Sequence, residues 1–243
     1  MSPLIFPVWD APAGVMAYSS TRRGGVSRPP YDSLNLGTHV GDEPDDVEEN
    51  RRLLAGMAAL PAQPCWLEQI HGTRVVTLDG LPVADTRADA VYTRLAGQVC
   101  AVMTADCLPV LFASRRGDEV AAAHAGWRGL CDGVLEQTVS CFSALPEEIV
   151  AWLGPAIGPT AFEVGAEVRA GFVHRDPQAA QAFVPRGDKY LADIYLLARQ
   201  RLRALGVHSI SGGEYCTVSQ PQDFFSYRRE RVTGRMASFI WIK

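Results

Sequence analysis

VMTADCLPVLFASRRGDEVAAAHAGWRG, which spans Val102–Gly129, is the most informative stretch of this chain. Two short apolar runs lie within it, at Pro109–Ala113 and Glu119–His124. The polar segment between them, SRRGD at Ser114–Asp118, contains Gly117, which suits a tight turn. The stretch therefore predicts a β-hairpin whose second strand leads through a glycine-rich turn into a helix.

Short apolar runs and helical patterns are interleaved along the rest of the chain. The runs predict strands at Val15–Ser20, Cys65–Ile70, Arg74–Leu78, Val99–Thr104, Val150–Leu153 and Met236–Ile242. Apolar residues at helical spacing predict helices from near Pro44, after Gly129, over the segment that carries Val164, Val168 and Phe172, and from about Asp188 to Gly206. This mixture indicates an α/β protein, a single-domain layered α/β sandwich over residues 1–243, and not a regular βαβ repeat.

Composition and charge exclude several classes of protein. Hydrophobic residues make up 47% and charged residues 21% of the 243 residues, as in globular proteins. The net charge of −4 argues against a nucleic-acid binder, whose contact face is normally strongly basic. No run approaches the roughly 18 apolar residues that a membrane span needs, and the first residues, MSPLIFPVWDAP, lack the features of a secretory signal. We expect a cytoplasmic protein that binds neither nucleic acid nor membranes.

The six cysteines do not indicate a disulfide framework. The chain is much longer than a disulfide-stapled domain, and it contains no CxxC pair of the kind found in many structural zinc sites. We expect Cys100, Cys131 and Cys141 to be small buried hydrophobic residues. Cys107 differs because of its sequence neighbours.

Three residues that bind metals lie at predicted strand ends. His71 is in EQIHGT, Cys107 in TADCLP and His124 in AAAHAGWRG. Two imidazoles and one thiolate suit zinc, and three protein ligands leave the fourth tetrahedral position for water or substrate. The spacings of 36 and 17 residues match no short zinc motif. An ordinary surface or core histidine remains the alternative for both His71 and His124, and His39 is left undecided.

The AGWRG segment is a candidate anion site. Its glycines, Gly126 and Gly129, allow backbone N–H groups to turn inward at the start of a helix, and Arg128 lies beside them. A phosphate bound there would lie close to His124. The alternative is an ordinary strand-to-helix turn.

Other polar residues are candidates for catalysis or substrate binding. Asp106 and Asp89 are expected to orient a ligand histidine or to act as acid and base, with turn or helix-cap roles as the alternative. The segment FFSYRRE (224–230), with Tyr227 and Arg228, has the groups to stack on a planar base and pair with an anion, although a half-buried strand is the simpler interpretation. The loop SLNLG (33–37), with Asn35, is also placed to reach a ligand.

A set of ordered motifs resembles one known family. The motifs are QIHG (69–72), RADA (87–90), TADCLPVL (104–111), AAHAGWRG (122–129), LGPAIGP (153–159), FEVG (162–165), FFSYRR (224–229) and TGRMAS (233–238). Together they are similar to the YfiH family, which is also called multicopper polyphenol oxidase (laccase-type) and purine nucleoside phosphorylase. The resemblance implies a compact α/β sandwich related to cytotoxic necrotizing factor-like cysteine hydrolases. It also implies a metal site on His71, Cys107 and His124.

The activities that this resemblance implies are phosphorolysis of adenosine, inosine, guanosine and methylthioadenosine, and deamination of adenosine. On that basis we expect a zinc enzyme, with copper as a second candidate metal, whose substrates are purine nucleosides and phosphate. Arg128, the AGWRG amides or Arg228 would hold the phosphate, and Asp106 or Asp89 would carry a proton to the departing base. A monomer and a homodimer are both compatible with the sequence.

Three rival functions remain. A multicopper oxidase needs several copper ions and about ten histidines, often in His-x-His pairs. This chain has five histidines and no such pair, so only a slow copper-dependent phenol oxidation is left as a side activity. Cys107 as nucleophile with His124 as base would give a metal-free hydrolase, for which editing of peptidoglycan precursors is the reaction attached to the family. A non-enzymatic metal-buffering or redox-responsive partner protein is the third possibility.

Overall fold

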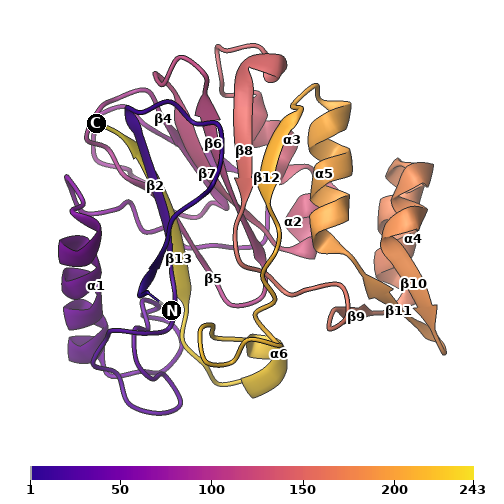
Figure 1. Cartoon of the computed structure of the whole chain (residues 1–243), viewed down its shortest axis with the longest axis horizontal. Coiled ribbons are helices and arrows are strands. Elements are labelled where there is room, and N and C mark those ends of the chain that lie inside the picture. Colours follow the sequence, from indigo (N-terminus) through magenta and orange to yellow (C-terminus); the bar gives the residue numbers. More distant parts are fainter. Residues whose placement is uncertain (1) are drawn as a thin grey trace.

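Two β-sheets lie face to face at the centre of the molecule, and helices cover their outer faces (Figure 1). This computed structural model describes residues 2–243, so Met1, the first residue of the predicted domain, lies outside the described residues. The layers follow one another as helix α1, a four-stranded sheet, a six-stranded sheet and a second helical layer. The predicted layered α/β architecture is confirmed.

The six-stranded sheet contains the predicted hairpin. Its strand order is β12–β8–β6–β7–β4–β3. The strands are β3 (Val75–Leu78), β4 (Ala90–Thr93), β6 (Leu108–Ser114), β7 (Val120–Ala125), β8 (Ile149–Leu153) and β12 (Ser209–Gly212). Strands β6 and β7 are antiparallel, and Pro109 lies opposite His124.

The four-stranded sheet is antiparallel throughout and has the order β1–β2–β13–β5. Its strands are β1 (Leu4–Ile5), β2 (Val15–Ser20), β5 (Cys100–Thr104) and β13 (Met236–Ile242). β13 therefore pairs on one side with a strand from the start of the chain and on the other with a strand from its middle.

The core explains why the central strands show no polar alternation. Every residue of β6 is buried, because this strand has a packed layer on each side. Leu108, Val110 and Phe112 point into the cluster formed with the helical layer, and Leu111 and Ala113 point into the cluster between the sheets. Successive side chains of a strand face opposite sides, so both sets are apolar.

Helix α1 (Pro44–Ala58) covers the outer face of the four-stranded sheet. The helix begins at Pro44, as predicted, and Asp45 and Asp46 lie near the positive end of its dipole. Leu54 is fully buried against the apolar face of the sheet, where it joins the cluster that contains Phe239.

Most of the remaining helices and a small third sheet lie on the other side, whereas the last helix of the chain lies at the lower end of the view (Figure 1). The helices are α2 (Trp127–Asp132), α3 (Val134–Val139), α4 (Ala166–Arg175), α5 (Ile194–Ala204) and α6 (Tyr227–Glu230), with 3-10 helices η1 (Pro146–Glu148) and η2 (Pro177–Ala182). The third sheet has the order β10–β11–β9, with β9 (Glu163–Val164), β10 (Phe183–Arg186) and β11 (Lys189–Ala192).

Three sequence predictions were wrong in detail. The helix predicted from about Asp188 begins only at Ile194, because Lys189–Ala192 pairs as strand β11 and the Asp193 side chain caps the helix by accepting a hydrogen bond from the N–H of Leu196. Val164, predicted in a helix, belongs to β9. The strand predicted at Cys65–Ile70 is reduced to isolated bridges.

The helix predicted after Gly129 is also divided. Gly133 adopts φ of 108°, a left-handed conformation, and separates α2 from α3. An L side chain is strained in this region of backbone space, whereas glycine is not.

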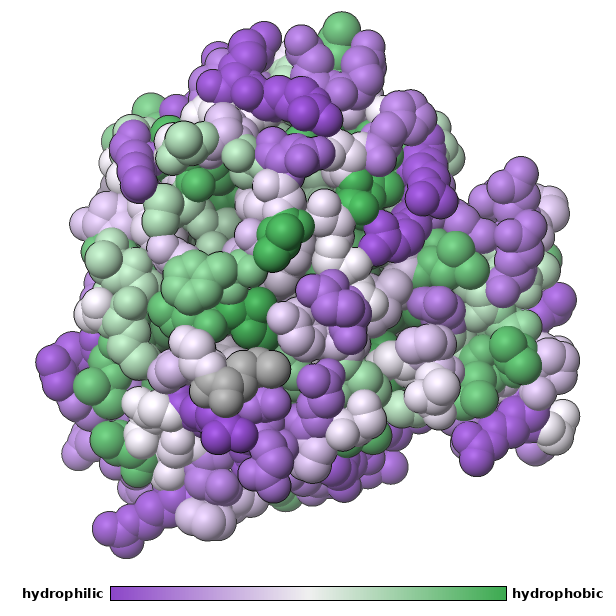
Figure 2. Space-filling view, viewed as in Figure 1, coloured by the Kyte–Doolittle hydropathy of each residue, from purple (hydrophilic) through white to green (hydrophobic). Residues whose placement is uncertain are grey.

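The surface and the cysteines fit the composition. In Figure 2 hydrophobic and hydrophilic side chains are intermixed on the face in view, and hydrophilic ones dominate its upper margin. All six cysteines are free thiols; Cys100 and Cys131 are buried as predicted, but Cys141 is only partly buried. None of the helices in residues 2–243 combines the length and the apolar character needed to cross a membrane.

A pair of glycine substitutions tests the helix break. Replacing Gly133 with Ala should lower the free energy of unfolding by about 1–2 kcal/mol, because alanine would be held at positive φ. Replacing Gly56, an exposed glycine inside α1 whose Cβ would meet nothing within 4 Å, should instead raise it by up to about 1 kcal/mol. Chemical denaturation measures both. Equal effects of the two substitutions would contradict the assignment of a strained break at Gly133.

Candidate metal centre

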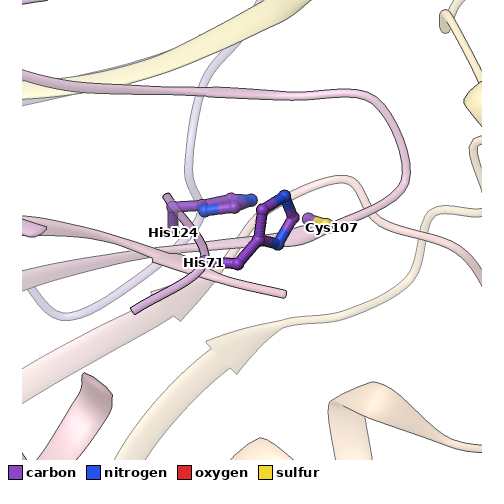
Figure 3. Close-up of side chains that lie close together, drawn as sticks. All are labelled: His71, Cys107 and His124. Atoms are coloured by element: carbon purple, nitrogen blue, oxygen red, sulfur yellow. The ribbon is translucent and has the colours of Figure 1, made fainter. Parts of the chain in front are cut away.

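Three side chains from distant parts of the sequence converge at one end of the sheets. One ligand atom each from His71, Cys107 and His124 lies within 4.8 Å of the others (Figure 3). His124 is buried, Cys107 is partly buried and His71 is exposed. Among residues 2–243, this is the only such group of three or more His, Cys, Asp or Glu side chains.

The hairpin positions two of these ligands. Cys107 immediately precedes β6, and His124 lies near the end of β7 in the register opposite Pro109. Alternate residues of a strand share a face. Leu111 and Ala122 both face the four-stranded sheet. Cys107 lies four residues before Leu111 and His124 lies two residues after Ala122, so each ligand shares the face of that neighbour. The two ligands therefore lie on the same side of the hairpin, at the edge of the space between the sheets.

His71 is positioned differently. It was expected at a strand end, but it lies in a loop and has a positive φ of 60°. The buried carboxylate of Asp89 holds this loop: Oδ1 accepts a hydrogen bond from the N–H of His71 (2.9 Å), and Oδ2 accepts from the N–H groups of Ile70 (3.2 Å) and Gly72 (2.6 Å). A strained residue persists where its surroundings hold it in place, as here.

Asp89 also contacts His124. Oδ1 of Asp89 lies 2.8 Å from Nδ1 of His124, and the backbone N–H of His124 donates to the carbonyl of Asp89 (2.7 Å). Burial would raise the pKa of Asp89, but the hydrogen bonds from His124, Gly72 and His71 outweigh burial and lower it. The ionised carboxylate can only accept hydrogen bonds, so Nδ1 of His124 carries a proton, and Nε2 is the atom that can bind a metal once its own proton has left.

The two imidazoles differ in basicity. Although the residue as a whole is exposed, partial burial of its ring lowers the pKa of His71, and the charge of His124 lowers it further. Burial also acts to lower the pKa of His124, but the neighbouring sulfur of Cys107 and the Asp89 carboxylate together raise it to about 9. The pocket around His124 is therefore electronegative, as suits a site for a cation.

Gly126 makes room for the ligands. A Cβ at this position would lie 2.8 Å from Nδ1 of His71 and 3.0 Å from Sγ of Cys107. Farther along α2, a Cβ on Gly129 would lie 2.7 Å from the carbonyl oxygen of Gly72. The two glycines of AGWRG thus let the start of α2 pack closely against the His71 loop.

The donor set fits a zinc or copper ion. Two imidazole nitrogens and one thiolate are ligands that both metals accept. With bonds of roughly 2.0–2.3 Å, the donor atoms of a tetrahedral zinc ion lie about 3.3–3.8 Å apart. The 4.8 Å limit measured here leaves about 1 Å to close, which side-chain rotation can supply.

A pocket of about 680 Å³ opens onto the three ligands. Its walls also contain Thr38, His39, Arg51, Trp66, Leu67, Glu68, Gln69, Thr86, Met103, Thr104, Ala105, Tyr227 and Arg235. Tyr227, a predicted substrate-binding residue, is in this wall. Arg51 and Trp66 were not predicted. Arg51 in particular looks like any charged residue on an amphipathic helix. Arg235 lies in the TGRMAS motif but was not singled out there.

Asp106 and Arg228 have structural partners. The Asp106 carboxylate accepts hydrogen bonds from the Thr217 hydroxyl and the backbone N–H of Arg228, both at 2.6 Å. It thereby ties the turn before β6 to the start of α6. The guanidinium of Arg228 donates to the carbonyl of Glu163 and lies over the ring of Phe162, outside the pocket wall.

Arg128 and Asn35 also lie outside the pocket wall. Arg128 is exposed, and its guanidinium lies 4.4 Å from the ring centre of Trp127. Asn35 is fully buried, and its Oδ1 accepts hydrogen bonds from the N–H groups of Gly37 and Arg235. Asn35 therefore fixes the loop that leads into β13, and it reaches the pocket only through Arg235.

Comparisons with known proteins agree with this fold. Residues 16–243 match the model of the family described as "Multi-copper polyphenol oxidoreductase laccase". The chain is 65% identical over 242 residues to "Purine nucleoside phosphorylase YfiH" of Escherichia coli K12, covering 100% of both proteins. It is 54% identical to a "Purine nucleoside phosphorylase" of Haemophilus influenzae, covering 98% of this chain and 99% of that protein.

The crystal structure of Neisseria meningitidis protein NMB0706 has the same architecture. It superposes with a TM-score of 0.94 at 49% identity and covers 100% of both chains. The fold and the His–Cys–His group define a layered α/β protein with a candidate metal centre. The chain belongs to the YfiH family, the same family as the laccase-type polyphenol oxidoreductases named above.

Replacing Asp89 with Asn tests the positioning of the ligands. We expect the affinity for zinc to fall about 10- to 100-fold, because the loop of His71 and the tautomer of His124 would both lose their anchor. Competition with a chromophoric chelator measures the affinity. Asp85→Asn, which changes an exposed carboxylate paired with Arg74 and Arg87, is the matched control. Native affinity in a folded Asp89→Asn variant would show that Asp89 does not position the site.

Replacing Gly126 with Ala tests the space between the ligands. The added methyl group would push His71 and Cys107 apart, so we expect the zinc bound per chain after dialysis to fall well below that of the native protein. Elemental analysis gives the ratio, and the Gly56→Ala variant serves as the control. Full zinc occupancy in Gly126→Ala would mean that the ligands do not need this gap.

Proposed function

We propose that this chain is a zinc-dependent purine nucleoside phosphorylase. The observation that carries the proposal is the His71–Cys107–His124 group on the wall of a pocket of about 680 Å³, in a chain 65% identical to a protein named a purine nucleoside phosphorylase. Pockets of roughly 300–1,000 Å³ accommodate a ligand the size of a nucleoside.

The reaction joins a phosphate oxygen to C1′ of the ribose while the bond from C1′ to the purine nitrogen breaks. The electron pair of that bond goes to the base, which takes up a proton. A zinc ion held by the three ligands would supply a Lewis acid that polarises a substrate oxygen. Tyr227, half exposed in the pocket wall, offers a ring on which the base or ribose can pack.

Asp89 and Asp106 act in this proposal as positioning residues. All four of their carboxylate oxygens already accept hydrogen bonds from the chain. Asp89 fixes His71 and His124, and Asp106 fixes the turn that carries Cys107. This supports an indirect role for both carboxylates in place of the proton transfer expected from the sequence. Adenosine deamination stays a prediction from the family resemblance.

A second function is favoured by one specific contact. Cys107, His124 and Asp89 form a Cys–His–Asp arrangement, in which Nδ1 of His124 lies 2.8 Å from Asp89. In such triads the thiolate attacks an acyl carbon and the imidazole carries the proton. The alternative is therefore a metal-free thiol hydrolase, which would not require His71.

Laccase-type chemistry is left as a side reaction. The matching family is described by several coppers, but residues 2–243 contain one group able to hold an ion. A single copper in the His₂Cys site could accept one electron from a phenol. We further expect a cytoplasmic protein that is a monomer or a homodimer.

Release of free base from adenosine and inosine tests the proposal. Release should require inorganic phosphate, stop on treatment with a chelator and return when zinc is added back. Cys107→Ser and His71→Gln should each lose nearly all of this activity, because each removes a zinc ligand. Cys141→Ser, which changes a thiol outside the pocket, should keep native activity. Chromatographic separation of base and nucleoside follows the reaction.

The same variants separate the rivals. Base release that is independent of phosphate would contradict a phosphorylase. Chelator-resistant cleavage of acyl substrates that survives His71→Gln but not Cys107→Ser would identify the thiol hydrolase.

A further inference from the structure

Two arginines line the pocket without a carboxylate partner. Arg51 comes from α1 and Arg235 from the segment just before β13. Neither takes part in any ion pair among residues 2–243. Arg52, the neighbour of Arg51 on the same helix, pairs with Glu49 and is exposed. A partly buried cation without a counter-ion is costly unless an anion joins it.

The chain holds both guanidinium groups in place without neutralising them. Nε and Nη2 of Arg51 donate to the carbonyl of Leu36 at 3.0 and 2.8 Å, and its guanidinium lies 4.2 Å from the ring centre of Trp66. Nη1 of Arg235 donates to the carbonyls of Thr233 and Gly234, both at 3.0 Å.

These contacts use only part of each donor set. An arginine has five N–H donors, so Nη1 of Arg51 and both Nε and Nη2 of Arg235 are left without a partner in the described part of the chain. Fixed guanidinium groups with free donors are the groups that bind phosphate oxygens in pairs.

Electrostatic interactions link Arg235 both to the metal centre and to His39. Arg235 interacts electrostatically with Cys107, Asp106 and Tyr227, although it forms no ion pair with Asp106, and both Arg235 and Arg51 act on His39. Burial, followed by these two arginines, lowers the pKa of His39, so its imidazole is neutral at pH 7 and can donate a hydrogen bond. Glu68, the carboxylate in this wall, is exposed and interacts with Arg87.

The geometry points to a phosphate site formed by Arg235, Arg51 and His39, and we propose that it binds the inorganic phosphate co-substrate. The inference rests on the proposed function, and it moves the phosphate from the AGWRG segment and Arg228, which lie outside the pocket wall, to residues that line the pocket. A phosphate on Arg235 would lie beside the metal ligands. The 5′-phosphate of a nucleotide has the same chemistry and is the other source to be distinguished.

Arg51→Gln and Arg235→Gln test the site. We expect each variant to raise the KM for inorganic phosphate about tenfold or more, the effect of one lost charge-assisted hydrogen bond, and to leave the KM for adenosine close to the native value. Arg52→Gln, on the same helix but outside this pocket, is the matched control and should keep native kinetics. Zinc content and thermal melting of each variant check that metal centre and fold are intact.

Lysine variants keep the test valid if a glutamine variant does not fold. Arg51→Lys and Arg235→Lys keep the charge but lose the paired donors, so their KM for phosphate should lie between those of the native protein and the glutamine variants. Unchanged KM for phosphate in folded Arg51 and Arg235 variants would overturn the proposal, above all if Arg128→Gln raises it.

Direct binding separates this proposal from the proposed function. Titration of inorganic phosphate, followed by ³¹P line broadening, should show binding to the native protein and weaker binding to both glutamine variants. That result without any phosphorolysis would keep the phosphate site and refute the phosphorylase. If both glutamine variants bind phosphate as tightly as the native protein and phosphorolysis is observed, the phosphorylase assignment stands and the proposed phosphate site is refuted. If adenosine 5′-monophosphate binds more tightly than adenosine, and only in the native protein, the site takes a nucleotide and the co-substrate assignment fails.

Discussion

The carboxylate of Asp89 holds the candidate site together. It is fully buried and accepts hydrogen bonds from three consecutive backbone N–H groups of the His71 loop and from the imidazole of His124. A buried charge is costly, and these charge-assisted bonds offset that cost only while the loop and the hairpin stay in their present positions. One side chain therefore couples the shape of a loop, the tautomer of a ligand and the pairing of β4 with β7. Gly126 and Gly129 add a steric condition, since the start of α2 packs against this loop without side chains between them.

The sequence indicated the parts of the fold that local patterns determine. The β6–β7 hairpin, α1 and strands β2 and β13 follow from turn residues, a proline in the first helical turn and apolar runs. Where long-range pairing competes with a local pattern, the prediction was wrong. Leu191 has helical spacing to the residues after it, yet it lies in β11 because β9 and β10 provide strand partners. Gly133 was not seen as a break, since a glycine within a helical pattern is often tolerated.

The residues of the candidate site also fall into those that local sequence indicates and those that only tertiary packing brings together. The metal ligands His71, Cys107 and His124 could be proposed from the sequence, because imidazole and thiol groups are typical metal ligands and lie here in recognisable motifs. Arg128 was chosen for phosphate by a local rule about helix starts, but the direction of its side chain depends on Trp127 and on the orientation of α2. Arg51 and Arg235 carry no local signal. They line the same pocket only because α1 and the segment before β13 are brought together by tertiary packing.

The central place of β13 in the four-stranded sheet has a consequence for biogenesis. Until Met236–Ile242 has left the ribosome, β2 and β5 have no strand between them, and the inner face of the six-stranded sheet lacks its cover. Arg235, which directly precedes this strand, cannot reach its position earlier. Nascent chains will therefore present the cysteine and both histidines to the cell before the cavity beside them exists. Binding of an ion at that stage would precede closure of the protein.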